Sequence, residues 1–420
     1  MKINKKSNKK RGWHWTDYFK SSELKLNKNH PKPTVFVAMS GGVDSSVTAY
    51  LLKQEGYQVV GMFMKNWSYP IKSIKECPLY QDYLDMVAVC KFLDIPHQVV
   101  SFEKEYKKRV IDDFFKDYER GLTPNPDVLC NREIKFDLFL KAAIEKGADL
   151  IATGHHIRSR KVKSKHSSRH FKTSYCHPEL DSGSKKIPGQ SASWRTEQLE
   201  RYELLRGKDP IKDQTYFVYP ITQNQLSKSL FPIGHYLKSD IRGIAKKANL
   251  PTATKRDSQG ICFIGRIDAK DFLKTRLKQK TGDIVDKEGK KLGEHEGAWF
   301  YTLGQRRIEG LSGTIKPMYV IGTDIKKNLV VVGDDKDTYG RFARIKSLHL
   351  INPKTPQKDL INQKFRAKSR YTPELSSGTL KKDKKGYYFE FSKPERAITP
   401  GQSLVLYKNQ VCIGGGVITK

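Results

Sequence analysis

The stretch that decides the fold is Val35-Phe-Val-Ala-Met-Ser-Gly-Gly-Val-Asp-Ser-Ser46, in which an apolar run leads into two glycines, an aspartate and hydroxyl side chains. The apolar residues predict a buried strand, and the residues from Val43 onward predict a helix. Gly41 and Gly42 allow a turn with positive φ, and the amides that open the helix point at whatever lies in that turn. The sequence therefore predicts a strand, loop and helix that together bind an anion.

This loop differs from the common ATP-binding loop G-x-x-x-x-G-K-[ST], whose lysine reaches the β- and γ-phosphates. Between Ser40 and Val47 the only hydrogen-bond donors that the chain offers are hydroxyls and backbone amides. Such a loop suits a pyrophosphate that leaves as one unit, so we expect ATP to be cleaved between its α- and β-phosphates with transfer of AMP. The Ser-Gly-Gly-x-Asp-Ser string resembles the PP-loop of ATP pyrophosphatases. A glycine turn without a ligand is the alternative.

Composition bounds the domain count and the partners. A chain of 420 residues is long enough for two or three domains, and its 78 Lys/Arg against 45 Asp/Glu give a net charge of +33. This excess favours a polyanionic partner such as nucleic acid, although a solvated lysine-rich surface is the alternative. Six cysteines do not make a disulfide framework, and no apolar run has the length of a signal peptide or membrane span. We expect a cytoplasmic protein that does not bind a membrane.

Short apolar strands alternate with amphipathic helices in the first half of the chain. The strands are expected at 35–39, 59–63, 97–100 and 150–152, and helices at 83–93 and 134–146. This alternation predicts an α/β fold, a Rossmann-like parallel sheet with helices on both faces. Ligands of such sheets bind beyond the carboxyl ends of the strands, where both the Ser40 loop and Gly154 would lie.

Shifts in composition divide the chain into four expected parts. They are a basic flexible extension over 1–32, a nucleotide-binding domain over 33–265, a small central domain over 266–342 and a C-terminal β-barrel over 343–420. The last part shows short alternating strands with turn glycines. Residues 159–200 lose apolar periodicity, which predicts a disordered insert. Its Cys176 and histidines are irregularly spaced, so we expect no metal site there.

Six further motifs follow the loop along the chain. They are Gly61-Met-Phe-Met-Lys-Asn-Trp67, Thr123-Pro-Asn-Pro-Asp-Val-Leu-Cys-Asn131, Ala152-Thr-Gly-His155, Lys212-Asp-Gln-Thr-Tyr216, Asp257-Ser-Gln-Gly-Ile-Cys-Phe-Ile-Gly265 and Thr399-Pro-Gly-Gln402. In this order they resemble the bacterial tRNA-specific 2-thiouridylases, the MnmA family of the PP-loop (adenine nucleotide alpha hydrolase-like) superfamily. The resemblance covers nearly the whole chain apart from the extension and the insert. It implies ATP-dependent transfer of sulfur to C2 of uridine 34 in tRNA, with AMP and pyrophosphate as by-products.

The chemistry of this reaction can be compared with the residue types. Replacing the C2 oxygen of uracil requires that oxygen to become a leaving group, which adenylation by ATP achieves. A persulfide attacks as an anion and is a competent source of sulfur. A second thiol can then release the thiolated base and leave a disulfide. We therefore expect two reactive cysteines, ATP with Mg²⁺, and a persulfide sulfur donor or relay protein as a partner besides tRNA.

Four of the six cysteines have no catalytic context. Cys90 lies in a helical apolar pattern and Cys412 in a strand pattern, so both are expected in the core. Cys77 is expected in a loop and Cys176 in the insert.

The remaining two cysteines, Cys130 and Cys262, are the reactive candidates. Cys130 follows an Asn-Pro-Asp turn and precedes a helix expected to begin near Arg132, whose N-terminus would lower the pKa of a thiol. Cys262 lies between glycines on an expected loop. The spacing does not assign their roles. The resemblance implies that Cys262 carries the persulfide, that Cys130 is its nucleophilic partner, and that the two form a transient disulfide.

Two aspartates each have two interpretations. Asp127 lies three residues before Cys130 and would exchange a proton with the base or a thiol, or else only close a turn or cap a helix. Asp44 would orient Mg²⁺ or only close the loop.

The resemblance also assigns binding residues. Those for ATP are Ala38, Met39, Ser40, Gly41, Gly42, Val43, Asp44, Ser45, Met64 and Gly154. Those for the flipped target base are Asn125, Pro126 and Asp127, and those for the rest of the tRNA are His155, Lys212, Asp213, Gln214, Arg370, Tyr371 and Gln402. Anticodon loops are recognised by stacking and polar contacts, which these residue types supply. The family commonly has Tyr where this chain has His156.

Two other functions share part of this pattern. Another PP-loop enzyme, such as a tRNA lysidine synthetase or an amidotransferase-type synthetase, would use Ser40 to Ser45 but would not need Cys130 and Cys262. A tRNA-binding protein without ATP use would keep only the charge.

Overall fold

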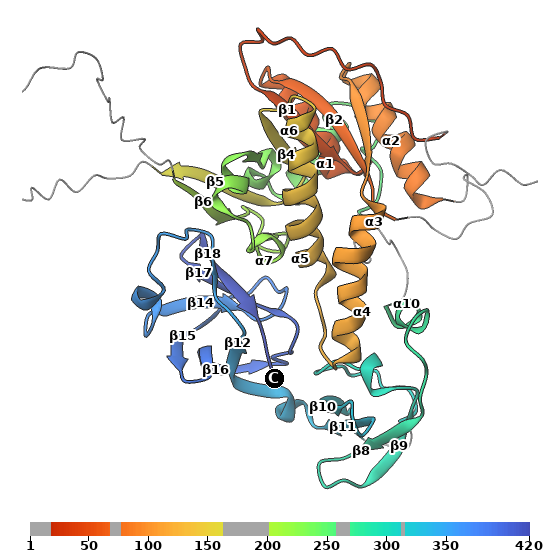
Figure 1. The fold of residues 1–420 in the computed structure, drawn as a ribbon, viewed down its shortest axis with the longest axis vertical. Helices are drawn as coiled ribbons and strands as arrows, with labels where there is room; N and C mark the ends of the chain where they lie inside the picture. Colours follow the sequence, from red (N-terminus) through yellow and green to blue (C-terminus); the bar gives the residue numbers. More distant parts are fainter. Residues whose placement is uncertain (1–17, 68–76, 163–200, 258–268, 312–315) are drawn as a thin grey trace, which may run out of the picture.

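The computed structural model describes residues 18–67, 77–162, 201–257, 269–311 and 316–420. The motif around Cys262 and the insert cysteine Cys176 lie outside these residues. Figure 1 shows the N-terminal domain above the C-terminal sheet and the small central domain, with a long helix running between them. Among the described residues, no helix has the length and apolarity needed to cross a membrane.

A five-stranded parallel sheet forms the centre of the first domain. Its order is β3 (His97–Ser101), β2 (Gln58–Lys65), β1 (Thr34–Met39), β4 (Leu150–Thr153) and β7 (Ser229–Leu230). Side chains alternate between two cores because strand residues point to opposite faces. Phe36 and Met62 belong to one core, whereas Val37 and Phe63 belong to the other. The predicted α/β fold with helices on both faces is confirmed.

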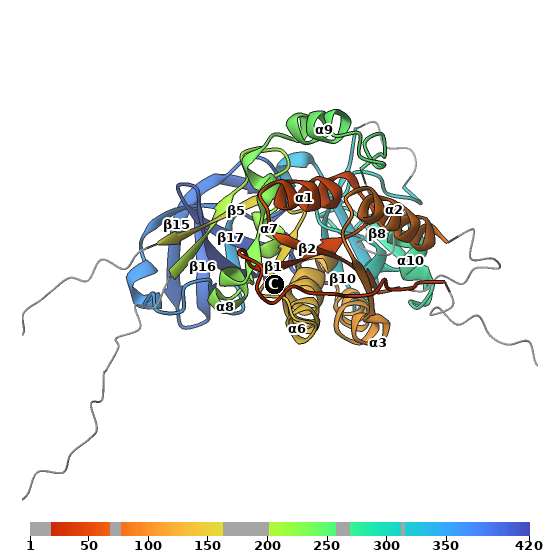
Figure 2. The same ribbon diagram turned by 90° about the horizontal axis from the view of Figure 1, so that it is seen from above.

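Helices cover both faces of this sheet, as Figure 2 shows from above. On the core that contains Phe63 lie α1 (Val43–Gln54), α2 (Pro78–Phe92) and α9 (Lys238–Lys247). On the other lie α3 (Glu103–Tyr106), η3 (Lys107–Ile111), α4 (Asp112–Glu119), α5 (Pro126–Cys130), η4 (Asn131–Phe139) and α6 (Leu140–Glu145). Two short helices, α7 (Thr215–Val218) and α8 (Gln223–Ser227), precede β7, and η5 (Pro232–His235) follows it.

The helix that carries Cys130 begins earlier than expected. Pro126 is the first residue of this helix, α5, and the Asn125 side chain accepts hydrogen bonds from the backbone N–H groups of Asp127 and Val128. This is a capped start with proline at its preferred position. The expected start near Arg132 is therefore wrong, and Cys130 lies inside a helix that runs on through η4 and α6.

The C-terminal domain is a curved antiparallel sheet with its own apolar core. Its strand order is β12 (Tyr339–Ile345), β16 (Gly386–Arg396), β15 (Ser376–Asp383), β14 (Lys364–Lys368), β17 (Ser403–Lys408), β18 (Val411–Val417), β6 (Arg201–Arg206) and β5 (Ile157–Val162), and β13 (His349–Leu350) pairs with β18. Two short helices, η7 (Asp335–Thr338) and η8 (Gln357–Leu360), accompany it. Because β12 starts at Tyr339, the boundary expected between residues 342 and 343 falls inside a strand and is corrected to its start.

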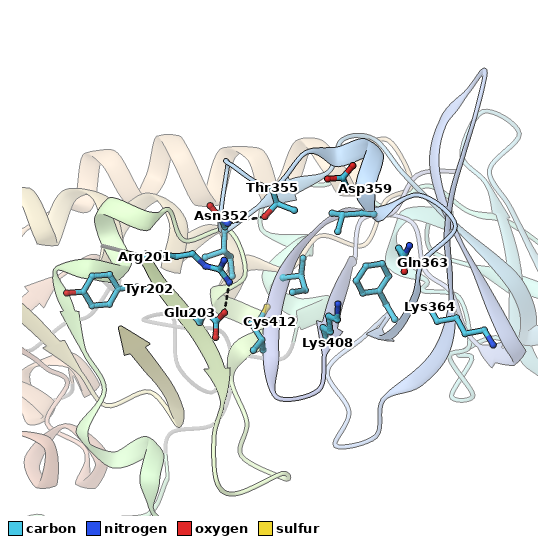
Figure 3. Close-up of a pocket in the computed structure, with 15 residues that line it drawn as sticks. Arg201, Tyr202, Glu203, Asn352, Thr355, Asp359, Gln363, Lys364, Lys408 and Cys412 are labelled. Atoms are coloured by element: carbon cyan, nitrogen blue, oxygen red, sulfur yellow. Dashed lines mark hydrogen bonds and ion pairs between the residues drawn. The ribbon is translucent and has the colours of Figure 1, made fainter. Parts of the chain in front are cut away.

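The hairpin β5–β6 corrects the expected insert. Ser159 pairs with Leu204 and Val162 with Arg201, so residues 159–162 are strand and not part of a disordered insert, and residues 163–200 lie outside the described residues. The hairpin continues the C-terminal sheet through the pairing of Cys412 with Leu204. A pocket of about 400 Å³ lies at this junction. Figure 3 shows its lining residues, among which Arg201 pairs with Glu203.

Residues 18–32 also differ from the expected flexible extension. Phe19 is buried, and its ring lies 5.0 Å from that of Tyr83 and 6.1 Å from that of Phe63. The Ser22 N–H donates to His97 O at 2.9 Å, along the edge strand β3. The apolar burial of one aromatic ring and the backbone pairing hold this part of the chain against the sheet.

The central domain is small and packs against α4. Its sheet has the order β10 (Tyr319–Asp324), β11 (Leu329–Gly333), β8 (Gly282–Val285) and β9 (Lys291–His295), with α10 (Ala269–Lys274) and η6 (Ala298–Phe300). The Phe272 ring lies 5.3 Å from Phe115 and 6.1 Å from Trp67. This contact joins the central domain to the first.

Candidate active site

The loop between β1 and α1 has the geometry predicted for an anion site. Gly41 has φ of +72°, and a Cβ there would lie 2.1 Å from the backbone oxygen of Asp82. Only glycine fits this position. The hydroxyls of Ser45 and Ser46 donate to Gly42 O at 3.0 and 2.8 Å and so close the loop on itself. The α1 amides remain as the donors directed at a ligand.

The end of β4 meets this loop. Ala38 pairs with Thr153, and the next residue, Gly154, approaches the start of α1 so closely that a Cβ would lie 2.9 Å from Ser45 N. On the other side of β1, Met39 pairs with Phe63, so Met64 lies beside Ser40 at the same sheet edge. The fold thus brings together the residues that the resemblance assigned to ATP.

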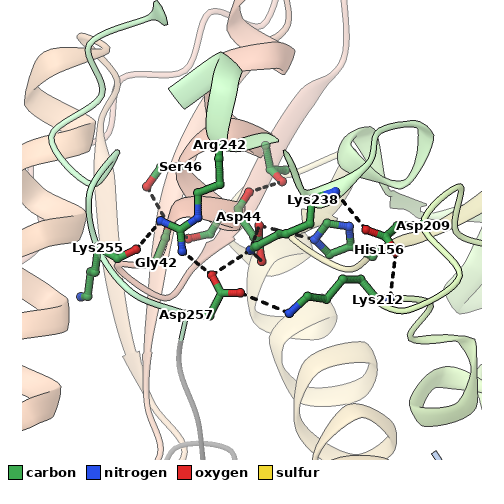
Figure 4. A network of polar contacts seen from close by, with 12 residues as sticks. Gly42, Asp44, Ser46, His156, Asp209, Lys212, Lys238, Arg242, Lys255 and Asp257 are labelled. Carbon is green, nitrogen blue, oxygen red and sulfur yellow. Dashed lines mark hydrogen bonds and ion pairs between the residues drawn. The ribbon is translucent and has the colours of Figure 1, made fainter. Parts of the chain in front are cut away.

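A lysine reaches the loop from a distant helix, which Figure 4 shows in detail. Lys238 Nζ lies 2.7 and 2.8 Å from the two carboxylate oxygens of Asp44, although 194 residues separate them in sequence. His156 Nε2 lies 3.5 Å from the same carboxylate. Burial opposes the charge of Asp44, but the nearby His156 and Lys238 outweigh it and lower the pKa of this carboxylate. Asp44 is therefore an ionised, paired carboxylate.

A second carboxylate, that of Asp257, contacts three cationic side chains beside this loop. It lies 3.0 Å from Lys238 Nζ and 3.3 Å from Lys212 Nζ, and Arg242 donates to it as well. Partial burial opposes its charge, but these three cations lower its pKa to about 2. Lys238 and Arg242 were not predicted as site residues, since a Lys-x-x-x-Arg spacing on an amphipathic helix is typical of a solvated face.

Cys130 occupies the last position of α5 and is fully buried. Asn131 follows it, and its amide donates to Phe217 O at 3.1 Å. Asn125 is the helix cap, and Asp127 lies in the first turn. Cys90 and Cys412 are buried as predicted for core residues, and burial raises the pKa of the Cys90 thiol to about 12 and also that of Cys412.

Asp213 is a structural residue in this arrangement. Its side chain is fully buried and lies 3.1 Å from Lys368 Nζ on β14 and 2.9 Å from Arg206 Nε on β6. It also accepts a hydrogen bond from Thr215 Oγ1 at 2.8 Å. Burial opposes its charge, but Lys368 and Arg206 lower its pKa below the ordinary value. The carboxylate therefore joins the two domains.

The neighbours of Asp213 lie at the domain boundary. Gln214 Oε1 accepts from the His156 N–H at 2.8 Å, and Lys212 contacts Asp257. His155 is buried, and its Nδ1 lies 2.8 Å from Thr153 Oγ1. Burial holds the pKa of the His155 imidazole well below the ordinary value, so the ring is neutral.

The barrel brings aromatic and amide groups to the same boundary. Tyr371 is 41% exposed, its ring lies 4.5 Å from that of Phe217 at a tilt of 42°, and its hydroxyl donates to Ile211 O at 3.2 Å. The neighbouring Arg370 has a buried Nε without a hydrogen bond among the described residues. Gln402 donates to Thr123 O at 2.9 Å and therefore supports the turn before Asn125.

These features define the class of protein: a PP-loop nucleotide-binding α/β domain joined to a central domain and a C-terminal β-barrel. Family models give the same order. The tRNA methyl transferase HUP domain matches residues 33–266, the tRNA methyl transferase PRC-barrel domain 270–334, and the aminomethyltransferase beta-barrel domain 341–418.

Curated relatives match nearly the full length. The tRNA-specific 2-thiouridylase MnmA of Christiangramia forsetii is 39% identical over 92% of this chain and 99% of its own. Those of Pseudomonas paraeruginosa and Shouchella clausii are 41% and 42% identical over 94% of this chain, and over 97% and 98% of their own. The chain belongs to the MnmA family, which confirms the resemblance.

Proposed function

We propose that this protein is a tRNA-uridine 2-sulfurtransferase that converts uridine 34 of tRNA to 2-thiouridine with ATP. The observation that supports this proposal is the Gly41–Gly42 loop in a chain that belongs to the MnmA family. Gly154 packs against the start of α1 beside this loop, and Lys238 contacts Asp44 within α1. The relatives are named for this activity on tRNA. The charge of +33 suits the same polyanionic substrate.

The first step is adenylation of the uridine C2 oxygen. The amides at the start of α1 bind the phosphates, and Lys238 turns from Asp44 toward the leaving pyrophosphate, whose charge it offsets. Mg²⁺ fits this site because Asp44 and Asp257 are carboxylate oxygen donors, and when bound it would neutralise the same charge. The C2 oxygen attacks the α-phosphorus, and pyrophosphate leaves as one unit.

The second step transfers sulfur. The terminal sulfur of a persulfide on Cys262 attacks C2, and the bond from C2 to the oxygen breaks so that AMP leaves with that oxygen. The Cys130 thiolate then attacks the Cys262 sulfur, which forms a Cys130–Cys262 disulfide and releases 2-thiouridine. Asp127, one turn from Cys130 on α5, exchanges the proton. A thiol reductant and a persulfide donor or relay protein restore the enzyme.

The RNA contacts follow the domain boundary. The turn Asn125–Asp127 receives the flipped base, and Lys212, Gln214, His155, Arg370, Tyr371 and Gln402 surround it from both domains. Asp213 acts through its neighbours as a positioning residue. Because tRNA and ATP are the substrates, we place the enzyme in the cytoplasm.

The test is direct detection of the product. Wild-type protein is incubated with uridine-34 tRNA, ATP and a persulfide donor, and the digested tRNA is analysed for 2-thiouridine by mass spectrometry. Cys130→Ser and Cys262→Ser are expected to abolish the product. Cys77→Ser is the matched control, since Cys77 caps α2, where serine is a preferred residue.

Two outcomes would overturn the proposal. One is a wild type that forms no 2-thiouridine, and the other is full activity in both Cys130→Ser and Cys262→Ser. Consumption of lysine with modification of a cytidine-34 tRNA would assign the protein to the lysidine synthetases instead.

A further inference from the structure

Asn66, directly after β2, has a buried side-chain amide without a hydrogen-bond partner. The residue is fully buried, and neither its Nδ2 nor its Oδ1 atom is bonded within the part of the chain that the structure describes. A buried donor or acceptor without a hydrogen bond destabilises the folded state, because it has lost its bonds to water without replacement. An apolar residue at this position would avoid this destabilisation, so the amide is expected to bind a partner from outside the described chain.

Two other buried polar residues in the described ranges also have unbonded atoms, but each has a polar contact that Asn66 lacks. His156 also lacks hydrogen bonds at both ring nitrogens, but its Nε2 lies 3.5 Å from the Asp44 carboxylate. Asn131 has an unbonded Oδ1, yet its amide nitrogen donates to Phe217 O. Asn66 differs from Asn131 because its donor and its acceptor both lack a hydrogen bond, and from His156 because the described residues place no charged partner such as Asp44 beside it.

Asn66 lies at the carboxyl edge of the sheet, where ligands of parallel sheets bind. Met39, the last residue of β1, pairs with Phe63, so Asn66 lies three residues further along, about 10 Å past this pair in the direction of the carboxyl edge. Its neighbour Trp67 packs on Phe272, which closes this edge from the central domain. The amide is therefore shielded from solvent and lies where ligands of parallel sheets bind.

The face of the sheet that Asn66 uses follows from strand alternation. Met62 and Met64 point into the core that also contains Val128 and Cys130 of α5. Continuing the alternation by two residues beyond Met64 places Asn66 on this face as well. Asn66 thus lies between the Met64 position of the nucleotide site and the helix that carries Cys130.

We propose that the Asn66 amide hydrogen-bonds the edge of a nucleobase, as a further specificity residue of the proposed thiolation reaction, on which this inference rests. An asparagine amide offers one donor group and one acceptor side by side. Adenine presents N6–H beside N1 or N7, and uracil presents N3–H beside O4, so either edge satisfies both atoms. Such a bidentate pair is typically worth about 1–3 kcal/mol of discrimination. The two sources are the adenine of ATP and the target uracil.

Two pairs of probes distinguish these sources by direct binding titration. The first pair is ATP and purine riboside triphosphate, which lacks the N6 amino group. The second pair is an anticodon stem-loop RNA with uridine at position 34 and the same RNA with an abasic site there. The proteins are wild type, Asn66→Leu and Asn66→Ala, each checked for folding by thermal melting.

We expect the wild type to discriminate within one pair by about 5- to 150-fold, and both variants to reduce that ratio below threefold while the other ratio stays unchanged. Both variants should melt at or above the wild-type temperature, because they remove unsatisfied groups. The inference is overturned if both variants keep the wild-type ratios, which would assign the amide to a bound water, or if the wild type discriminates within neither pair. Formation of 2-thiouridine by the wild type in the same preparation separates this failure from failure of the proposed function.

Discussion

Replacing Lys368 by Met tests the ion pair that joins the barrel to the nucleotide-binding domain. Lys368 Nζ is fully buried 3.1 Å from Asp213 Oδ2, and the rings of Tyr371 and Tyr407 lie about 6 Å from the same nitrogen. Methionine keeps the length of the side chain and removes its charge. The variant therefore leaves the Asp213 carboxylate buried with one cation fewer.

The loss of stability in Lys368→Met depends on the hydrogen bonds that the Asp213 carboxylate keeps. Removing one partner of a buried pair costs about 3–5 kcal/mol. Arg206 and the donors of Gly207 and Thr215 still bind the carboxylate, so we expect the lower end, about 3 kcal/mol. At about 2–4 °C per kcal/mol for domains of this size, the melting temperature should fall by roughly 6–12 °C.

The assay is thermal melting of wild type, Lys368→Met and a control, Lys381→Met, followed by kinetics at a temperature where all three are folded. Lys381 pairs with Glu390 on the same barrel, but both side chains are 37% exposed, so we expect little change there. Lys368→Met should also raise KM for tRNA more than KM for ATP, because Lys212 and Gln214 flank Asp213. Equal melting of Lys368→Met and Lys381→Met would refute the reasoning.

Three further predictions concern the nucleotide site and pH. Lys238→Met should raise KM for ATP about tenfold or more with little effect on KM for tRNA, since a charge-assisted bond is worth about 1.5–3 kcal/mol; unchanged steady-state kinetics would contradict this. Gly154→Ala places a Cβ 2.9 Å from Ser45 N and should weaken ATP binding in a titration, whereas Gly243→Ala on α9, with no atom within 4 Å, should stabilise the fold by about 0.5–1 kcal/mol. The pKa values of Asp213 and Asp257 are lowered, the latter to about 2, so their stabilisation is present above the ordinary carboxylate pKa of 3.8 and is lost as pH falls toward 2. Denaturant midpoints at pH 7 and pH 3 should show this loss, and a smaller loss in Asp257→Asn.

The strand, loop and helix over residues 34–54 could be predicted because their signals are local. The apolar run, the glycine pair and the helix that follows are adjacent in sequence, and Gly41 needs its positive φ whatever the rest of the chain does. The core positions of Cys90 and Cys412 were likewise visible in the apolar residues around them.

The features that were missed depend on contacts between distant segments. Lys238 meets Asp44 across 194 residues, and nothing near Lys238 in the sequence indicates an anion site. Strand β5 is half exposed and polar, so its sequence shows no apolar alternation, and only its pairing with β6 and the barrel makes it a strand. Phe19 was similarly one aromatic residue in a basic stretch.

Asp213 illustrates the limit of transferring roles from a motif. Its place in Lys212-Asp-Gln214 implied a contact with tRNA, whereas the structure uses its carboxylate to hold Lys368 and Arg206 between two domains. A sequence shows that a residue belongs to a motif, but the direction of its side chain depends on the neighbours that fold against it.

Isotope transfer shows whether the uridine C2 oxygen is adenylated and leaves with AMP. A tRNA transcript labelled with ¹⁸O at uracil C2 is thiolated by the enzyme with unlabelled ATP, and the nucleotide products are analysed by mass spectrometry. The proposed reaction predicts one ¹⁸O atom in AMP for each 2-thiouridine formed, and none in pyrophosphate. AMP without the label, or label released to water, would contradict it.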